Sequence, residues 1–212
     1  MGLYQIYVLP RVIDRLLGGE GMGRWRSKAT SGLVGQVLEI GYGTGLNVAY
    51  YPSEVTGVFA VEPSKVAMAI ARRRETSTDV KVEHVGLDGQ DLPLADECCD
   101  SALCTFTLCS IPNVERAIRE VHRVLKPGAL FHFLEHGLAP DESVFAWQRR
   151  IDPWEQRLAD GCSLVRDPIA LVSASGFIME TQKQRYAKGP KPWSYFSVGV
   201  ARKSNEQRGH HK

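Results

Sequence analysis

The sequence predicts an α/β fold with a doubly wound, mostly parallel sheet and helices on both faces. Two observations lead to this prediction. Apolar runs typical of buried strands alternate with helical segments between residues 36 and 134. The last two expected strands, 177–181 and 195–200, are joined by a short loop, so we expect them to be antiparallel neighbours.

The elements follow in a regular order. Strands are expected at 36–40, 57–61, 80–84, 101–105 and 130–134. Helices are expected at 46–51, 64–73, 114–125 and 167–174. Ser64 suits an N-cap after Pro63, and Pro127-Gly128 is expected to stop the helix at 114–125.

We divide the chain into three parts. Residues 1–35 form a helical cap segment, in which a short helix follows Pro10 and a glycine-rich linker follows that helix. Residues 36–203 form the main domain, with 141–160 as an insertion that covers the substrate. Residues 204–212 are polar, and we expect a flexible tail.

The composition excludes several classes of protein. The 212 residues carry 43% hydrophobic residues, 24% charged residues and a net charge of +2, which is close to the globular average. There is no basic stripe of the kind that marks a dedicated nucleic-acid binder. No apolar run reaches the ~18–20 residues that span a bilayer. We therefore expect no stable membrane insertion and no signal peptide, while peripheral association stays open.

The cysteines indicate the compartment. There are five, an odd number, and none forms a CxxC pair. Free thiols in a reducing cytoplasm are the simpler interpretation, and we expect neither a disulfide framework nor a metal site.

The most informative segment is a strand that runs into the alternating glycines of Gly41–Gly45. Glycines permit a tight turn and a close approach of the backbone to a ligand, and the following helix offers free N–H groups. The glycines of Gly19–Gly23 have the same spacing, but they follow a helix rather than a strand. We interpret that second segment as a flexible linker.

Two carboxylates indicate the ligand. Glu62 closes the second strand, where an acidic residue binds both hydroxyls of a ribose. Glu39 lies two residues before the first glycine, where it suits an ammonium group and repels a diphosphate. The GxGxG spacing also argues against a standard dinucleotide site. S-adenosylmethionine, which has a ribose, a sulfonium and an ammonium, fits these requirements.

Here the chain resembles the class I S-adenosylmethionine-dependent methyltransferases, in particular the type 11 group. The resemblance covers residues 36–137 and adds three motifs to the glycine loop and Glu62. Asp88–Pro93 is similar to the family's D-A-x-x-L-P stretch, with Gly89 where Ala is usual. Cys99-Asp100 stands where Phe-Asp is usual, and Arg119–Gly128 follows the family pattern.

The resemblance implies a Rossmann-like sheet of order 3-2-1-4-5-7-6 and a set of cofactor contacts. Glu39 and the glycines would hold the methionine half, Glu62 the ribose, Asp88 the adenine amino group, and the Gly89 N–H would face the ring. The implied cofactor-binding residues are Glu39, Gly41, Tyr42, Gly43, Gly45, Asn47, Glu62, Pro63, Asp88, Gly89 and Thr105.

A narrower resemblance extends beyond residue 137. Phe133–Gly137, Trp147–Arg150, Asp160–Arg166 and Gly199–Lys203 look like the alkyl-thiol methyltransferase branch. Mammalian members of that branch associate with membranes through an N-terminal hydrophobic segment, which we do not find here, so we do not carry anchoring over. The resemblance implies an enzyme that methylates a small, apolar acceptor, with a thiol favoured, and releases S-adenosylhomocysteine.

Two residues at strand ends are candidates for chemistry. His136 ends the fifth strand and is a candidate general base. Its alternative is a structural histidine that bonds to the neighbouring loop. Cys109 follows the fourth strand and either lines the acceptor pocket or packs as a small buried hydrophobe.

Two further residues belong to the acceptor side of the narrower resemblance. Trp147, together with Trp154, either caps an apolar cavity or is part of the core. Arg166 either binds an acidic substrate group or pairs with a neighbouring aspartate.

Three other functions remain open from the sequence. A lipid or quinone acceptor methylated at N, O or C is the second choice of substrate. The chain is alternatively a non-catalytic sensor or partner protein that binds S-adenosylmethionine. A nicotinamide oxidoreductase is the weaker rival. As partners we expect a small-molecule acceptor and no nucleic acid, in a monomer or homodimer.

Overall fold

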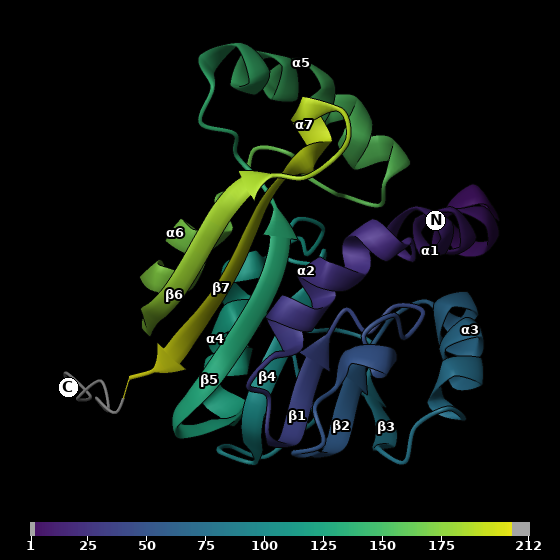
Figure 1. The fold of residues 1–212 in the computed structure, drawn as a ribbon, viewed down its shortest axis with the longest axis vertical. Helices are drawn as coiled ribbons and strands as arrows, with labels where there is room; N and C mark the ends of the chain where they lie inside the picture. Colours follow the sequence, from purple (N-terminus) through teal and green to yellow (C-terminus); the bar gives the residue numbers. More distant parts are fainter. Residues whose placement is uncertain (1–2, 205–212) are drawn as a thin grey trace.

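The computed structural model describes residues 3–204, so the predicted tail lies almost entirely outside the described residues. One sheet has the order β3-β2-β1-β4-β5-β7-β6, as predicted (Figure 1). The first five strands are parallel, and β7 runs antiparallel to both β5 and β6. The strands are β1 (Gly35–Ile40), β2 (Val55–Val61), β3 (Lys81–Gly86), β4 (Cys99–Thr105), β5 (Leu125–His136), β6 (Phe177–Tyr186) and β7 (Tyr195–Lys203).

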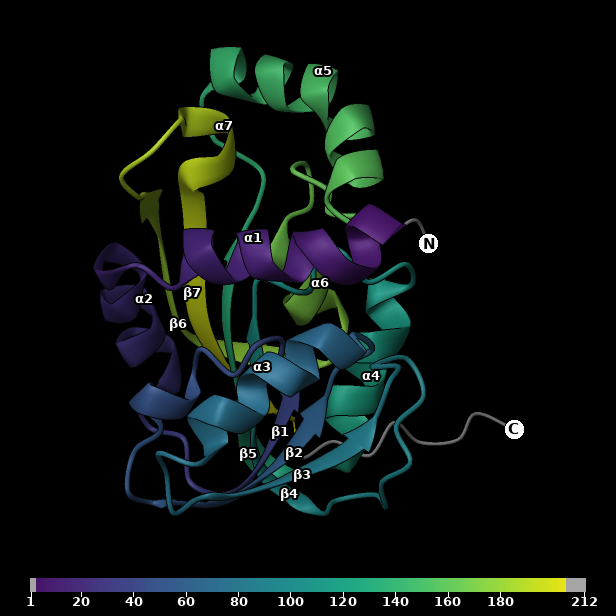
Figure 2. The same ribbon diagram turned by 90° about the vertical axis from the view of Figure 1, so that its right-hand side faces the viewer.

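Helices cover both faces of the sheet (Figures 1 and 2). They are α1 (Leu9–Leu17), α2 (Glu20–Thr30), α3 (Lys65–Glu75), α4 (Val114–Val124), α5 (Glu142–Leu158), α6 (Pro168–Ala174) and α7 (Lys191–Ser194). A π-helical turn, η1 (Tyr4–Val8), precedes α1, and a 3-10 turn, η2 (Val48–Tyr50), follows the glycine loop. Ser64 caps α3 by accepting from the Ala67 N–H at 3.2 Å, as predicted.

Alternation along β5 shows how the two cores form. Phe131 and Phe133 are fully buried on the side of α4 and α6. Leu134 is buried in the second cluster, which α2 and α3 line. His132 is also buried, and its Nδ1 lies 2.9 Å from the Ala29 carbonyl oxygen of α2. The central strands are therefore apolar on both faces, as buried parallel strands require.

The glycine-rich segment Gly19–Gly23 was predicted to be a linker, and that prediction is wrong. Gly21 and Gly23 lie inside α2. A Cβ at Gly23 would lie 2.6 Å from the hydroxyl oxygen of Tyr50, so the missing side chain lets α2 pack closely on η2. Tertiary packing outweighs the low helix propensity of glycine at this place.

The sequence indicated that Pro127-Gly128 stops the preceding helix, and the structure shows that it does not. Helix α4 already ends at Val124, and β5 begins at Leu125. The Pro-Gly pair lies within β5, where the pairing with β4 shifts register and Gly128 has a φ of 73°. The pair therefore forms an irregularity in the strand, a place where both residues are tolerated.

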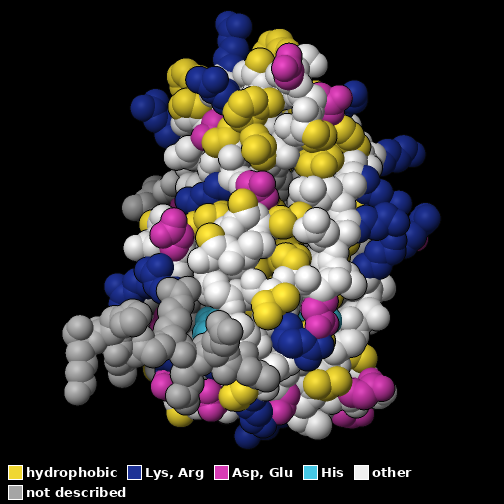
Figure 3. Space-filling model, turned by 90° about the vertical axis from the view of Figure 1, so that its left-hand side faces the viewer, with side chains coloured by type: hydrophobic (Ala, Val, Ile, Leu, Met, Phe, Trp, Pro, Cys, Tyr) yellow, Lys and Arg dark blue, Asp and Glu magenta, His cyan; other side chains and the backbone are white. Residues whose placement is uncertain are grey.

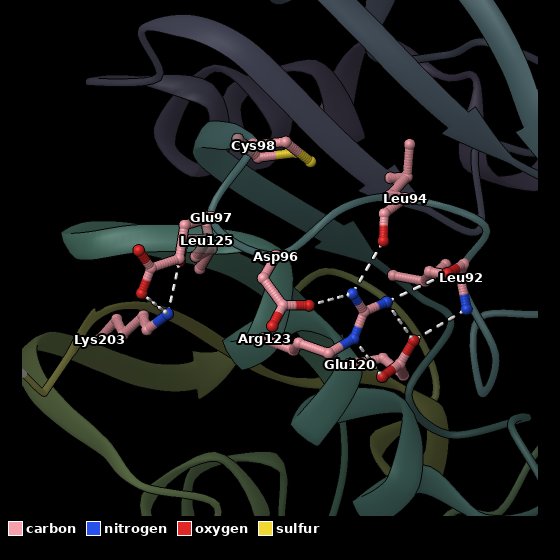
Figure 4. Close-up of polar contacts among 10 residues, drawn as sticks. Leu92, Leu94, Asp96, Glu97, Cys98, Glu120, Arg123, Leu125 and Lys203 are labelled. Atoms are coloured by element: carbon pink, nitrogen blue, oxygen red, sulfur yellow. Dashed lines mark hydrogen bonds and ion pairs between the residues drawn. The ribbon is translucent and has the colours of Figure 1, made fainter. Parts of the chain in front are cut away.

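An arginine fixes the long connection between β3 and β4 (Figure 4). The Arg123 guanidinium on α4 donates to the carbonyl oxygens of Leu92 at 3.0 Å and Leu94 at 2.8 Å. It also pairs with Glu120, whose carboxylate accepts from the Leu92 N–H at 2.9 Å. These contacts satisfy backbone groups that have no partner in the sheet. They also anchor to α4 the connection between β3 and β4, which contains Asp88.

Helices α5 and α7 lie beyond the carboxyl end of β5 (Figure 1). Figure 3 shows hydrophobic side chains mixed with Lys and Arg at this end of the molecule. Trp147 and Trp154 on α5 are 58% and 64% exposed, so they are not part of the core. Within residues 3–204, no helix is both long and apolar enough to cross a membrane.

Replacing Gly199 by Ala is expected to destabilise the sheet between β5 and β7. The new Cβ would lie 2.4 Å from the ring of Phe133, which is fully buried, so the ring or the strand would have to shift. Overpacking of this kind costs about 1–3 kcal/mol. The free energy of unfolding from urea titration measures the effect. Gly21→Ala, where nothing lies within 4 Å, is the matched control; equal stability of the two variants would contradict the prediction.

Candidate functional site

The glycine loop turns sharply between β1 and η2. Gly41, Gly43 and Gly45 have φ values of 70°, 57° and 74°, a left-handed region that favours glycine. A Cβ at Gly41 would lie 1.9 Å from the hydroxyl of Thr107, and one at Gly45 would lie 3.2 Å from the Cβ of Ala71. A Cβ at Gly43 meets nothing closer than 3.8 Å. The loop is therefore packed on both sides and open at Gly43, where a ligand has room to approach.

Glu39 lies beside this loop and is fully buried. Its carboxylate accepts from Asn47 Nδ2 at 2.8 Å and from the Tyr51 hydroxyl. Burial raises the pKa of Glu39 to about 7, although the hydrogen bonds from Tyr51 and Asn47 and the charge of Arg26 lower it. A cationic ligand group would favour the ionised form.

Arg26 completes the cluster, and the sequence analysis missed it. Its guanidinium donates to Asn47 Oδ1 at 2.7 Å and Thr105 Oγ1 at 3.3 Å, while Asn47 also donates to Thr105 at 3.0 Å. Arg26 Nε is buried without a hydrogen-bond partner among the described residues. No local sequence signal marks Arg26, because it reaches the loop only when α2 packs on the sheet.

Glu62 is buried at the carboxyl end of β2. One carboxylate oxygen accepts from the Gly43 N–H at 2.8 Å, and the other accepts from the Ser64 N–H at 2.7 Å. Burial raises the pKa of Glu62, although these two hydrogen bonds lower it. Each oxygen keeps a lone pair, so the carboxylate still has acceptor capacity for two hydroxyls.

The remaining predicted cofactor residues lie around the same edge of the sheet. Asp88 is exposed after β3, where the hydrogen bonds from Gln90 lower its pKa. A Cβ at Gly89 would lie 2.8 Å from Ile40 Cγ2, which accounts for glycine at this position. Pro63 is exposed, whereas Tyr42 is buried with its ring against His84 at 5.5 Å.

Helix α1 lies against the glycine loop through one aspartate. Asp14 accepts from Thr44 of the loop and from Arg74 of α3 at 2.8 Å. Arg74 also donates to the Thr44 carbonyl oxygen at 2.7 Å. Asp14 thus attaches α1 to the glycine loop. Helix α1 crosses the carboxyl edge of the sheet (Figure 2).

Near the carboxyl ends of β4 and β5, Cys109 and His136 lie together with a third residue, Cys162. His136 Nε2 is 3.0 Å from Cys162 Sγ, which is 3.5 Å from Cys109 Sγ. The hydrogen bond from Cys162 and the charge of His136 hold the pKa of Cys109 well below its usual range. Burial lowers the pKa of His136, but Cys109 raises it to about 9.

The structure gives contacts for Arg166 and Trp147. The Arg166 guanidinium donates to the carbonyl oxygens of Leu108 and, at 2.8 Å, Ile111, and no ion pair with an aspartate is found for it within residues 3–204. It therefore holds the loop that carries Cys109. Trp147 is exposed, and the guanidinium of Arg150 lies 5.8 Å from its ring centre.

Comparisons with known proteins show the family to which the chain belongs. Residues 38–133 match the family described as a methyltransferase domain. Human thiol S-methyltransferase TMT1A is 33% identical over 163 residues, covering 74% of this chain and 65% of the relative. Rat thiol S-methyltransferase TMT1B is 33% identical over 178 residues, covering 81% of this chain and 70% of the relative. The chain thus spans about two-thirds of the length of these relatives.

The chain belongs to the class I S-adenosylmethionine-dependent methyltransferases. It lies in their thiol methyltransferase-like branch, and its cofactor is S-adenosylmethionine.

More distant matches show the same family and fold. Demethylmenaquinone methyltransferase of Clavibacter sepedonicus is 30% identical over 120 residues, covering 55% of this methyltransferase and 49% of the relative. The S-adenosylmethionine-dependent methyltransferase of Mesorhizobium loti has a TM-score of 0.64 at 18% identity, covering 88% of this chain and 99% of its own. This structural likeness bears on the fold alone.

Replacing Arg166 by Leu is expected to destabilise the methyltransferase by about 1.5–3 kcal/mol, the range for hydrogen bonds to a charged group. The reason is that the carbonyl oxygens of Leu108 and Ile111 lose their donor. Urea unfolding followed by circular dichroism measures the loss. Arg119→Leu, an exposed site on α4, serves as the control. An Arg166 variant as stable as this control would show that the loop does not depend on the guanidinium.

Proposed function

We propose that this methyltransferase transfers the methyl group of S-adenosylmethionine to a small, apolar thiol. The extent of the similarity carries the proposal. The matches to the human and rat thiol S-methyltransferases run over 163 and 178 residues, well beyond the shared domain at 38–133. Quinone-type relatives match over 120 and 159 residues, 55% and 66% of the chain, at 30% and 28% identity. The likeness to thiol methyltransferases therefore includes segments outside the common cofactor domain.

The residues around the glycine loop fit the cofactor. Glu39 and Arg26 present a carboxylate and a guanidinium side by side, which suits the ammonium and carboxylate of a methionine moiety. The unpartnered Arg26 Nε is a donor available to that carboxylate. Glu62 would accept from the ribose hydroxyls, and Asp88 with the Gly89 N–H would meet the adenine. When bound, the cofactor supplies a methyl group on a sulfonium centre.

The chemistry asks little of the protein beyond positioning. Methyl transfer joins the acceptor sulfur to the methyl carbon, breaks the bond from that carbon to the sulfonium, releases one proton and leaves S-adenosylhomocysteine. A thiol needs only a modest fall in its pKa to become the reactive thiolate. Cys109 and His136 lie near the carboxyl ends of β4 and β5, on the edge that carries the cofactor residues. The general-base role of His136 stays a prediction.

We place the protein in the cytoplasm, supported by its five free cysteines. Its partner is a small-molecule acceptor, and we expect a monomer or homodimer.

Transfer of labelled methyl to a panel of thiols, phenols, amines and lipid extracts tests the function. We expect a labelled thioether from the wild-type protein. Gly43→Asp places a side chain and a negative charge at the open point of the loop, so transfer should fall by about tenfold or more, equivalent to 1.4 kcal/mol or more. Gly19→Asp, at a position with nothing within 4 Å, is the matched control.

The alternatives give different results in the same assay. Label in a lipid or phenol fraction, with none in thiols, would exclude the thiol acceptor and support the second choice of substrate. Cofactor binding without transfer to any acceptor would support a sensor or partner protein.

Cofactor affinity is expected to rise about fivefold between pH 6 and pH 7, because the ammonium group prefers ionised Glu39, whose pKa is about 7 without ligand. Below that pH a proton must leave before the cation binds. Tyr51, whose pKa burial raises well above its usual range, does not titrate in this window. Calorimetry at several pH values measures the change. Glu39→Gln should bind weakly and without this slope, whereas Glu83→Gln, an exposed site, should retain it; a slope that persists in Glu39→Gln would assign it to another group.

A further inference from the structure

Two thiols and an imidazole from three separate parts of the chain meet at the acceptor side. Cys109 follows β4, His136 ends β5, and Cys162 lies in the loop after α5. Their Sγ and Nε2 atoms all lie within 4.8 Å of one another. Within residues 3–204, this is the one group of three or more Cys, His, Asp or Glu side chains that satisfies this condition.

We propose that Cys109, His136 and Cys162 hold a zinc ion whose fourth position is open to a thiol acceptor. Zn–S bonds of about 2.3 Å and Zn–N bonds of about 2.0 Å in a tetrahedron place two sulfurs about 3.7 Å apart, and a sulfur and a nitrogen about 3.5 Å apart. The two sulfurs are 3.5 Å apart, and His136 Nε2 is 3.0 Å from Cys162 Sγ. The sulfur–sulfur distance is therefore close to the tetrahedral value, and the distance from His136 Nε2 to Cys162 Sγ is about 0.5 Å shorter than that value.

The surrounding backbone holds this arrangement in place. The Ser163 N–H donates to the Cys109 carbonyl oxygen at 3.0 Å, so the two cysteine loops are joined directly. Asp152 of α5 accepts from Ser163 Oγ at 3.1 Å and from the Leu164 N–H at 2.6 Å. These hydrogen bonds hold the loop with Cys162 against the loop with Cys109, so the two thiols are already close together.

A buried glutamate holds the other side. Glu135, which precedes His136 in β5, accepts from the Thr107 N–H at 2.9 Å and the Leu108 N–H at 3.1 Å. These two residues come directly before Cys109. The strand that supplies the imidazole thus also fixes the loop that supplies the first thiol.

The charges and exposure suit a catalytic rather than a structural metal site. Two thiolates balance the charge of Zn²⁺, and the imidazole binds as a neutral ligand. Three protein ligands leave one coordination position free, the pattern of zinc sites that bind substrate. Cys109 is buried, whereas His136 and Cys162 are half-buried.

The position relative to the cofactor residues gives the ion a role. Cys109 comes four residues after Thr105, which belongs to the Glu39 cluster. An acceptor thiol bound at the free position loses its proton to solvent and is held as a thiolate at the carboxyl edge of the sheet. This role rests on the proposed thiol methylation, whereas binding of the ion does not.

Metal content and cobalt spectra test the site. The full chain, isolated under reducing conditions without chelators, is expected to carry about one zinc per molecule by mass spectrometry. Replacing that zinc with Co²⁺ should produce thiolate-to-cobalt charge-transfer absorption. Cys109→Ser, Cys162→Ser and His136→Gln should each lower the zinc content at least about tenfold, an effect of 1.4 kcal/mol or more.

Cys98→Ser is the matched control, because Cys98 is a half-buried thiol that contacts Cys99 and lies outside the cluster. It should retain the zinc. Binding of S-adenosylmethionine by each variant shows that the variant has folded. Zinc that persists in a folded double variant of Cys109 and Cys162 would overturn the proposal. So would isolated wild-type protein without metal, whether the two thiols are free or joined as a disulfide.

Activity separates this proposal from the proposed function. Zinc-loaded protein that methylates no thiol would refute thiol methylation and leave the metal site intact. Metal-free protein that methylates thiols at the full rate would refute the role of the ion and leave the function intact.

Discussion

The carboxylate of Glu39 lies fully inside the protein, and the elements of the cofactor side are arranged around it. An isolated buried carboxylate is very costly, so it needs donors and an opposite charge close by. Asn47 and Tyr51 supply the donors, and Arg26 supplies the charge. Because these groups come from the glycine loop, the segment after η2 and helix α2, the one carboxylate fixes three elements against β1.

The sequence predicted the site best where the functional residues lie close together along the chain. The glycines at 41–45, Glu39 and Glu62 lie on a continuous strand–loop–strand path, so their spacing alone indicated a ligand. Arg26 belongs to the same cluster and was not predicted, because its contact with Asn47 exists only after α2 has packed on the sheet. The glycines of α2 obscured this helix, although one of them, Gly23, marks a close contact with Tyr50 and not flexibility.

The acceptor side shows the limit of such patterns more clearly. Cys109 and Cys162 are 53 residues apart, and His136 lies between them, so no metal-binding spacing appears in the sequence. They meet because β4 and β5 end at the same edge of the sheet and the loop after α5 returns to it. Arg166 was expected to face a substrate or an aspartate. It is instead used by the carbonyl oxygens of the loop at 108–111, which have no partner in a strand.

The position of β7 has a consequence for how the protein is made. This strand, Tyr195–Lys203, is synthesised last, yet it lies between β5 and β6 in the sheet. Until it leaves the ribosome, β5 presents an unpaired apolar edge and β6 has no strand to join. While residues 137–194 are synthesised, the growing chain therefore has an unpaired strand edge that is prone to aggregation. A chain truncated before Tyr195 would keep this unpaired edge of β5.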